Sequence, residues 1–149
     1  MLTNTLLAIY NQIANDAHEM VTTYVDKADL TGKVNYASIF AHSQEEFVRF
    51  TKEIEANGAV YDVQSTGNYY LLNKPFTTRA GTVSICRVRT FDTDHAERGY
   101  LDFEVVNYKK FKTKYLQQPH FLLMKLPHVE IVELRVPGYN VRAYFPDGL

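Results

Sequence analysis

The sequence predicts an α+β fold in which two βαββ-type modules form a curved mixed sheet, with an extra N-terminal helix. Three observations carry this prediction. A strand–helix–strand–strand order runs over residues 36–91, and the same order returns over residues 99–145. An apolar stripe of helical period precedes both. Because one such module cannot enclose a core alone, we expect both to pair within a single domain. The expected parts of this domain, residues 1–149, are the helix at 3–25, the first module at 34–91 and the second module at 99–146.

The composition is that of an ordinary globular protein. Hydrophobic residues make up 46% of the chain and the formal net charge is -1, so we expect no nucleic-acid partner, which a basic excess would indicate. The single cysteine, Cys86, cannot form an intrachain disulfide and favours a reducing, cytoplasmic location. The chain does not open with a basic stretch and no apolar run is long enough to span a bilayer. Neither a signal peptide nor a membrane partner is therefore expected.

The first expected element is an amphipathic helix that is capped by Thr3 or Asn4 and ends near Val25. Its apolar side chains recur at steps of three and four residues and so form one stripe for burial. The members of this stripe are Leu6, Ile9, Tyr10, Ile13, Ala17, Met20, Val21 and Tyr24. The segment Asp26–Lys33 is expected to be a polar connector.

The first module is expected to open with a short apolar strand at Val34–Ala41. Ser43 is followed three residues later by Glu46, which is a capping-box pattern for a helix at Gln44–Asn57. The rest of the module is expected to contain strands at Ala59–Val63, Tyr69–Leu72 and Thr82–Phe91, and a loop at Asn73–Gly81 that holds Pro75.

The second module repeats this order after a polar joint at Asp92–Arg98, which is the expected hinge between the modules. A strand at Gly99–Val106 comes first, and Asn107 is expected to cap a helix at Tyr108–Leu116. The expected later strands are Phe121–Leu126, Val129–Val136 and Val141–Phe145, with a turn at Pro137–Asn140 before the last.

Acidic residues are expected on one face of the strand Gly99–Val106. Side chains alternate along a strand, so Tyr100, Asp102 and Glu104 share one face, and the apolar residues between them face the helices. We expect the polar set to face the hollow of the curved sheet. Two carboxylates at this spacing suit a divalent cation such as Mg²⁺, Ca²⁺ or Mn²⁺. They also suit acid–base chemistry, or ion pairs with arginines across the sheet, and the sequence leaves these interpretations open.

Either face of the strand Thr82–Phe91 could be the inner one, but its arginine-bearing face fits a polar cavity better, so arginines from three strands are expected on the concave face. They are Arg87, Arg89, Arg135 and Arg142, and a further acidic residue, Glu133, is expected beside them. Because guanidinium groups match carboxylate and phosphate, this set predicts a pocket for a small anionic ligand. The alternative is an internal ladder of salt bridges. His42 and His95 are interpreted as solvated loop residues, and Cys86 as a small core residue.

The doubled module resembles the vicinal oxygen chelate superfamily, which has the glyoxalase and extradiol-dioxygenase fold. Within it, the chain most resembles the YecM-type branch of metal-binding proteins, which begin with a helical segment. Asn35–Ile39 resembles the first strand of that branch and Gly99–Val106 resembles a later strand ending in His-Ile-Glu-Ile-Val. The resemblance implies a U-shaped sheet around a divalent metal. It places Tyr36 and Asp102 where the family usually has histidine ligands, and Glu104 at an acidic position of the family.

Two functional expectations follow. The first is a small-molecule-binding or metal-dependent enzyme domain with an anionic ligand in the concave face, as a monomer or homodimer. In it Glu104 and Asp102 act as acid and base or hold a metal together with Glu133, and Tyr36 orients the substrate. The substrate-binding residues are then Arg87, Arg89, Tyr100, Arg135 and Tyr144. The second expectation is a non-catalytic interaction or regulatory domain whose cavity is filled by its own tyrosines.

Overall fold

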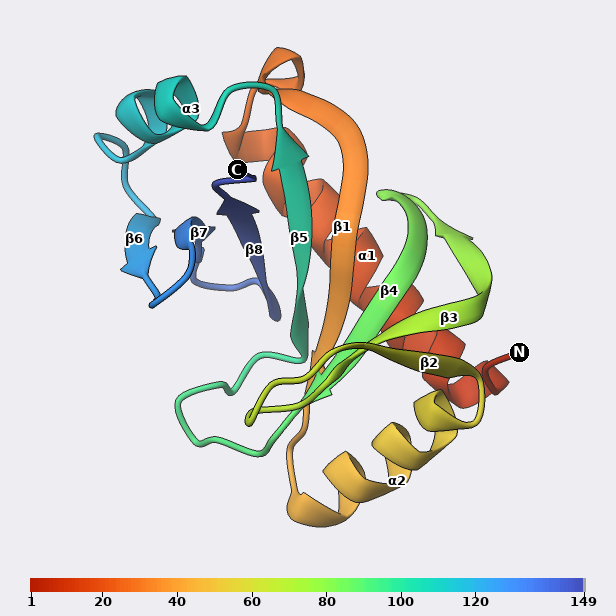
Figure 1. Cartoon of the computed structure of the whole chain (residues 1–149). Helices are drawn as coiled ribbons and strands as arrows, with labels where there is room; N and C mark the ends of the chain where they lie inside the picture. Colours follow the sequence, from red (N-terminus) through yellow and green to blue (C-terminus); the bar gives the residue numbers. More distant parts are fainter. Residues whose placement is uncertain (149) are drawn as a thin grey trace.

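The computed structural model describes residues 1–148. Three helices and eight strands form an α+β fold with one open, mixed sheet, and the helices are α1 (Asn4–Tyr24), α2 (Gln44–Glu55) and α3 (Tyr108–Tyr115) (Figure 1). A short 3-10 turn, η1 (Lys27–Asp29), links α1 to the sheet. The strands are β1 (Leu30–Phe40), β2 (Gly58–Asp62), β3 (Tyr69–Thr78), β4 (Gly81–Arg89), β5 (Gly99–Val105), β6 (Phe121–Lys125), β7 (Glu130–Leu134) and β8 (Val141–Pro146). This confirms the predicted fold class.

The sheet is built from two modules with corresponding strand orders, which lie on either side of its centre. Its strand order is β2-β3-β4-β1-β5-β8-β7-β6. β1 and β5 pair antiparallel, and each has the last strand of its own module parallel beside it, β4 beside β1 and β8 beside β5. Ser38 lies opposite Tyr100, Arg87 lies beside Ser38, and Arg142 lies beside Tyr100. Arg87 and Arg142 therefore occupy corresponding positions in the two modules.

The N-terminal helix packs its apolar stripe against the back of the sheet, where α1 runs behind β1, β4 and β5 in Figure 1. The Thr3 hydroxyl accepts a hydrogen bond from the Leu6 N–H at 3.3 Å, which confirms the cap. The buried Tyr10 hydroxyl donates to the Arg87 carbonyl oxygen at 2.8 Å. Because that contact fixes the backbone of β4, it also fixes where the Arg87 side chain leaves the opposite face of the sheet.

The two shorter helices begin at the predicted caps and complete the same core. The Ser43 hydroxyl accepts from the Glu46 N–H at 3.0 Å, and the Asn107 side-chain oxygen accepts from the Lys110 N–H at 3.1 Å. The buried residues Phe50, Ile54, Phe111 and Tyr115 join α1 in one cluster. With all three helices contributing to that cluster, the opposite face of the sheet is left free to carry a site. Within residues 1–148, no helix has the length and hydropathy needed to cross a bilayer.

Three local expectations are corrected. Each helix is followed by three strands, so each module is βαβββ rather than βαββ. β3 continues through most of the expected loop Asn73–Gly81; Pro75 is tolerated because β2 pairs with β3 only up to Leu72, which leaves no ladder partner there for the missing N–H. The expected connector Asp26–Lys33 holds η1 and the start of β1, where Leu30 already pairs with Val105.

Candidate functional site

An open cavity of about 870 Å³ lies on the face of the sheet that carries no helix. Its lining comes from the central strands and from two hairpin turns, β2–β3 and β6–β7, that border it on either side. Of the residues expected from the sequence to form a site, it contains Tyr36, Arg87, Arg89, Asp102 and Glu104. The structure therefore brings the acidic residues of β5 and the arginines of β4 to one hollow.

Asp102 is the most deeply buried acid of the cavity, with only 4% of the residue exposed. One carboxylate oxygen accepts a hydrogen bond from the Asn35 side-chain amide at 2.9 Å. No cation of residues 1–148 forms an ion pair with this carboxylate, so burial raises its pKa to about 7, and the Asn35 hydrogen bond opposes this only in part. Asp102 can therefore hold or release a proton near neutral pH.

Tyr36 and Glu104 lie on either side of Asp102 but differ in burial. Tyr36 pairs with Asp102 across β1 and β5, and its ring packs on Tyr69 with 4.8 Å between centroids. Burial, and then the nearby Asp102 charge, raise the pKa of Tyr36 to about 12, so its phenol stays protonated and is a hydrogen-bond donor. Glu104 is more exposed and lies 4.0 Å from the Lys33 ammonium group.

Arg87 is a buried cation with neutral partners. The residue is 4% exposed, and its guanidinium donates to the Tyr69 hydroxyl at 3.1 Å and to the Thr66 hydroxyl at 2.8 Å. It also lies over the Tyr69 ring, 4.5 Å from the centroid. No carboxylate of residues 1–148 forms an ion pair with Arg87 or with the neighbouring Arg89, and the Nε atom of each is buried without a hydrogen-bond partner.

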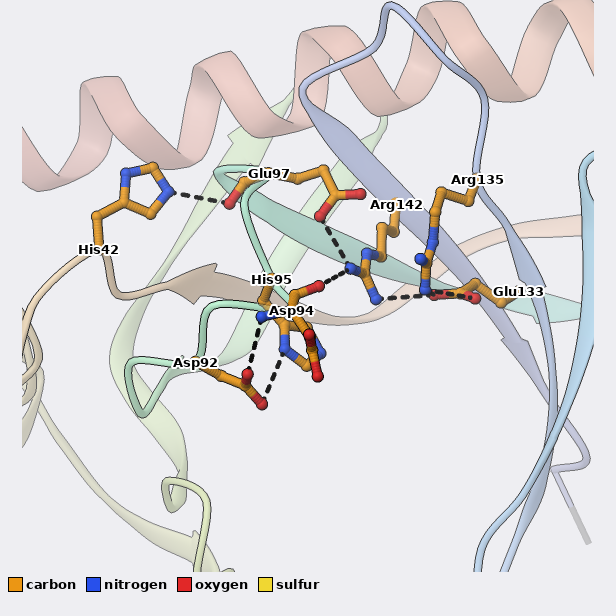
Figure 2. A network of polar contacts seen from close by, with 8 residues as sticks. All are labelled: His42, Asp92, Asp94, His95, Glu97, Glu133, Arg135 and Arg142. Carbon is orange, nitrogen blue, oxygen red and sulfur yellow. Dashed lines mark hydrogen bonds and ion pairs between the residues drawn. The ribbon is translucent and has the colours of Figure 1, made fainter.

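Arg142, the counterpart of Arg87 in the second module, is neutralised from within the chain (Figure 2). Its guanidinium contacts the Glu133 carboxylate at 3.2 Å and the Glu97 carboxylate at 3.0 Å, and it donates to the Asp94 carbonyl oxygen at 2.7 Å. Arg135 donates to the same Glu133 carboxylate at 3.1 and 3.2 Å. For Glu133, Arg135 and Arg142, the salt-bridge interpretation is the one that the structure shows.

The joint at residues 92–98 is part of this network rather than a solvated hinge. His95 packs edge-on against Phe40, with ring centroids 4.7 Å apart, and its Nδ1 lies 3.3 Å from an Asp92 carboxylate oxygen. Burial, and then the cations Arg89 and Arg142, lower the pKa of His95. The expectation that His95 is a solvated loop residue is therefore wrong. The His42 ring nitrogen Nε2 is hydrogen-bonded to the Glu97 carbonyl oxygen at 3.0 Å, although His42 itself stays exposed.

Aromatic side chains fill the space between Arg142 and the open cavity. Tyr100 and Tyr144 pack with 4.2 Å between ring centroids, and Phe40 packs on Tyr100 at 5.6 Å. Ile131 completes this second, smaller apolar cluster. The Tyr100 hydroxyl reaches the hydroxyl of the cavity residue Tyr69 at 3.0 Å. We call the region formed by Phe40, Tyr100, Tyr144, Glu133 and Arg142 the filled region.

The donor set expected for a metal does not come together. Within residues 1–148, no group of three or more His, Cys, Asp or Glu side chains is placed to hold a metal ion. Glu133 is committed to two arginines, Asp102 to Asn35, and Glu104 faces Lys33. Residues that the sequence reasoning missed are Asn35, Tyr69 and Glu97. Asn35 and Tyr69 are uncharged, and Glu97 lies in the segment that the sequence predicts to be a polar joint.

Comparison with known proteins identifies the fold. No family model matches the chain, and no curated protein matches it. The chain is similar to a solved structure titled "Structural Genomics, Protein EC4020", with a TM-score of 0.72, 10% identity, and coverage of 98% of this chain and 92% of that chain. A glyoxalase/bleomycin resistance protein/dioxygenase superfamily member from Vibrio splendidus 12B01 matches with a TM-score of 0.44, 6% identity, and coverage of 76% and 97%. At 10% identity, the first likeness shows that the chain shares its fold with that solved protein.

Proposed function

We propose that the chain binds a small organic anion in the open cavity, with Arg87 and Arg89 as the anion-binding groups. The single observation that carries the proposal is the difference between two corresponding arginines. Arg142 is neutralised by Glu133 and Glu97, whereas Arg87 is equally buried and has only hydroxyl partners. A buried cation without a counter-charge destabilises the fold, so a bound anionic ligand beside it would be favourable.

The remaining cavity residues supply orientation and a proton. The Tyr69 and Thr66 hydroxyls hold the Arg87 guanidinium in place, and the Tyr36 phenol is a donor toward the ligand. Asp102 lies on β5, opposite Tyr36 of β1. Its raised pKa lets it donate or accept a hydrogen bond at neutral pH. Arg87 and Arg89 thus bind the charged end of the ligand, while Asp102 and Tyr36 meet its other polar groups. Proton transfer by Asp102 is the chemical step that this arrangement supports.

The volume of the cavity supports a ligand of metabolite size. About 870 Å³ falls in the range of small-molecule sites. The resemblance of the strand motifs to the vicinal oxygen chelate superfamily, and to its YecM-type branch, supports the same location for a ligand. The proposal assigns Asp102 and Glu104 to ligand contacts rather than to a metal, because their donors do not converge with a third.

A titration followed by ¹H–¹⁵N NMR tests anion binding. Hexanoate, 3-phenylpropanoate and glycerol 3-phosphate are added separately to the wild-type protein and to Arg87→Met. We expect at least one of these anions to shift the backbone amides of Tyr69, Arg87 and Arg89. We also expect its affinity to fall about 10-fold or more in Arg87→Met, because a charge-assisted contact is lost.

Arg79→Met is the matched control, since Arg79 is an exposed arginine in the turn between β3 and β4. Its affinity should equal that of the wild type. Arg89→Met serves as a second test if Arg87→Met does not fold, as judged by circular dichroism. The proposal is wrong if none of the three anions shifts cavity amides, or if both cavity variants bind as well as the wild type.

Calorimetric titration with Mn²⁺, Zn²⁺, Mg²⁺ and Ni²⁺ tests the metal-dependent version of the function. We expect no heat beyond dilution, because the cavity offers no third convergent carboxylate or imidazole. A binding heat that disappears in Glu104→Gln would instead assign Glu104 to a metal and favour the metal-dependent enzyme.

A second candidate function is favoured by one observation, the packing of the filled region. Tyr100, Tyr144 and Phe40 occupy the space beside Arg142, which is the arrangement expected of a non-catalytic domain whose cavity is plugged. It would apply to the whole concave face only if the cavity beside Arg87 bound no ligand, so the NMR titration decides between the two functions.

A further inference from the structure

We infer that the ligand of the open cavity is an aromatic acid with a single negative charge, an inference that rests on the proposed anion site at Arg87. Three features of the cavity lead to it. Tyrosine rings line the cavity from β1, β2 and β3, aliphatic side chains line it from the β6–β7 hairpin, and Asp62 and Glu104 line it without an ion pair to either arginine.

The aromatic wall comes from three strands of the first module, the neighbours β2 and β3 and, beyond β4, the strand β1. Tyr36 on β1, Tyr61 on β2 and Tyr69 on β3 all line the cavity. The Tyr36 and Tyr69 rings are in contact, and the Arg87 guanidinium lies over the Tyr69 ring. The anion-binding group therefore lies against an aromatic ring that itself contacts a second ring. Aromatic rings prefer offset or edge-on contacts with one another, so a ligand ring next to its acid group would pack against these tyrosines.

The opposite wall is formed by the turn between β6 and β7 and by the strand after it. Leu126, Val129 and Ile131 line the cavity from this side. Leu126 is 51% exposed and Tyr61 is 55% exposed, so large exposed side chains from both hairpins border the cavity. Exposed apolar groups that border a polar hollow are typical of a site that covers an apolar part of a ligand.

The acidic residues limit the charge of the ligand. Asp62 and Glu104 line the cavity together with the two arginines, and neither forms an ion pair with them. A second negative charge at the far end of the ligand would meet these carboxylates and be repelled. Nucleotides, dicarboxylates and other ligands with separated negative charges are therefore disfavoured, while one acid group beside Arg87 is accepted.

Three matched acids test the inference by NMR titration of the full chain at pH 7.5. The probes are 3-phenylpropanoate, 3-cyclohexylpropanoate and 3-(4-carboxyphenyl)propanoate. We expect the phenyl acid to bind about 2- to 10-fold more tightly than the cyclohexyl acid, although the cyclohexyl ring is the larger apolar group. The acid with a second carboxylate on its ring should bind more weakly than the phenyl acid.

Two tyrosine variants locate the effect. Tyr36→Leu removes a ring from the aromatic wall and should abolish the preference for phenyl over cyclohexyl. Tyr24→Leu, on α1 and therefore behind the sheet, is the matched control and should keep the preference. Equal or tighter binding of the cyclohexyl acid in the wild type would overturn the aromatic ligand but leave the anion site standing. Tighter binding of the dicarboxylate would overturn the single charge. Binding of none of the three acids would overturn the aromatic ligand, and the anion site would then be decided by hexanoate and glycerol 3-phosphate.

Discussion

The open cavity and the filled region use corresponding arginines in opposite ways. Arg87 and Arg142 each lie on the strand parallel to the first strand of their module, in line with the pair Ser38 and Tyr100. In the filled region, carboxylates from β7 and from the joint at 92–98 surround the guanidinium. In the cavity, the Arg87 guanidinium is hydrogen-bonded to two hydroxyl groups and lines the open hollow.

This difference indicates how a repeated module acquires a site. Where the chain supplies its own counter-charge, the arginine becomes part of the scaffold. Where it does not, we propose that the corresponding arginine binds an anionic ligand. A buried ion pair stabilises a fold only weakly compared with apolar packing, but removing one member leaves the other unpaired and is strongly destabilising. The two arginines should therefore respond differently to the same substitution, and five predictions compare the two regions.

The largest expected effect is that of Arg142→Met in the filled region. This change leaves Glu133, which is 1% exposed, without its buried partner and removes the ion pair of Glu97. We expect the free energy of unfolding in urea to fall by about 3–5 kcal/mol at pH 7. Arg49→Met, which removes an exposed pair with Glu45 on α2, should change it by less than about 1 kcal/mol. A loss for Arg142→Met as small as that of Arg49→Met would contradict the scaffold role.

The second effect is the pH dependence of stability that Asp102 gives to the cavity. Its pKa rises from 3.8 to about 7 on folding, so the folded state binds more protons than the unfolded state between these values. Stability is therefore full below about pH 4 and falls as the pH rises to about 7. We expect Asp102→Asn to match the wild type near pH 4 and to exceed it by about 2–4 kcal/mol at pH 8. Urea denaturation at both pH values measures this difference.

Glu97, which forms an ion pair with Arg142 of the filled region, should give the opposite pH dependence of stability. Burial raises the pKa of Glu97, but the contacts with Arg142 outweigh it, so the net shift is downward. Its contribution to stability is thus present above the unfolded pKa and disappears as the pH falls through the folded value. Glu97→Gln should therefore be less stable than the wild type at pH 7 and approach it in acid. Parallel pH profiles for the Asp102 and Glu97 variants would show that the two regions do not differ in this respect.

A smaller effect is expected where the two regions meet, at the hydroxyl groups of Tyr69 and Tyr100. Tyr100→Phe removes their 3.0 Å hydrogen bond but keeps the packing of the ring on Tyr144. We expect stability to fall by about 1 kcal/mol. A loss above about 3 kcal/mol would mean that Tyr100 is part of the charged network rather than a packed wall. Thermal unfolding followed by circular dichroism is sufficient to tell these outcomes apart.

The smallest expected effect on stability is that of Arg87→Met in the absence of ligand. The change removes two hydrogen bonds to hydroxyls, and it also removes a buried cation without a counter-charge. These contributions oppose each other, so we expect stability to change by less than about 1 kcal/mol. Urea unfolding beside Arg142→Met gives the direct comparison. If Arg87→Met were as destabilising as Arg142→Met, Arg87 would be a scaffold residue and the open cavity would lose its distinguishing feature.

Much of the fold could be predicted because its local signals agree. The caps at Thr3, Ser43 and Asn107 and the helical stripe of α1 gave helices at the right places. The alternation along β5 and β4 put Asp102, Glu104, Arg87 and Arg89 on the face away from the helices. The extent of β3 was missed, because Pro75 predicts a break unless the neighbouring strand is known to end before it.

The division of the concave face could not be predicted from alternation alone. Alternation assigns Arg87 and Arg142 to the same face but does not show which carboxylates reach them. Glu97 lies in a polar segment that looks solvated in the sequence, and only the path of residues 92–98 beside β8 brings it to Arg142. Asn35 and Tyr69 are neutral, so nothing in their type signals contact with Asp102 or Arg87. These contacts are set by three-dimensional proximity between segments far apart in the chain.

The position of β8 between β5 and β7 has a consequence for folding. Both neighbours are in place in the sequence before β8, and in the finished sheet they are one strand apart. If β7 paired directly with β5 instead, Glu133 would lack its ion pair with Arg142 and would face a strand that carries acids of its own, and like-charge pairs disfavour a sheet register. We expect the Arg142 ion pair to favour the insertion of β8 between its two neighbours.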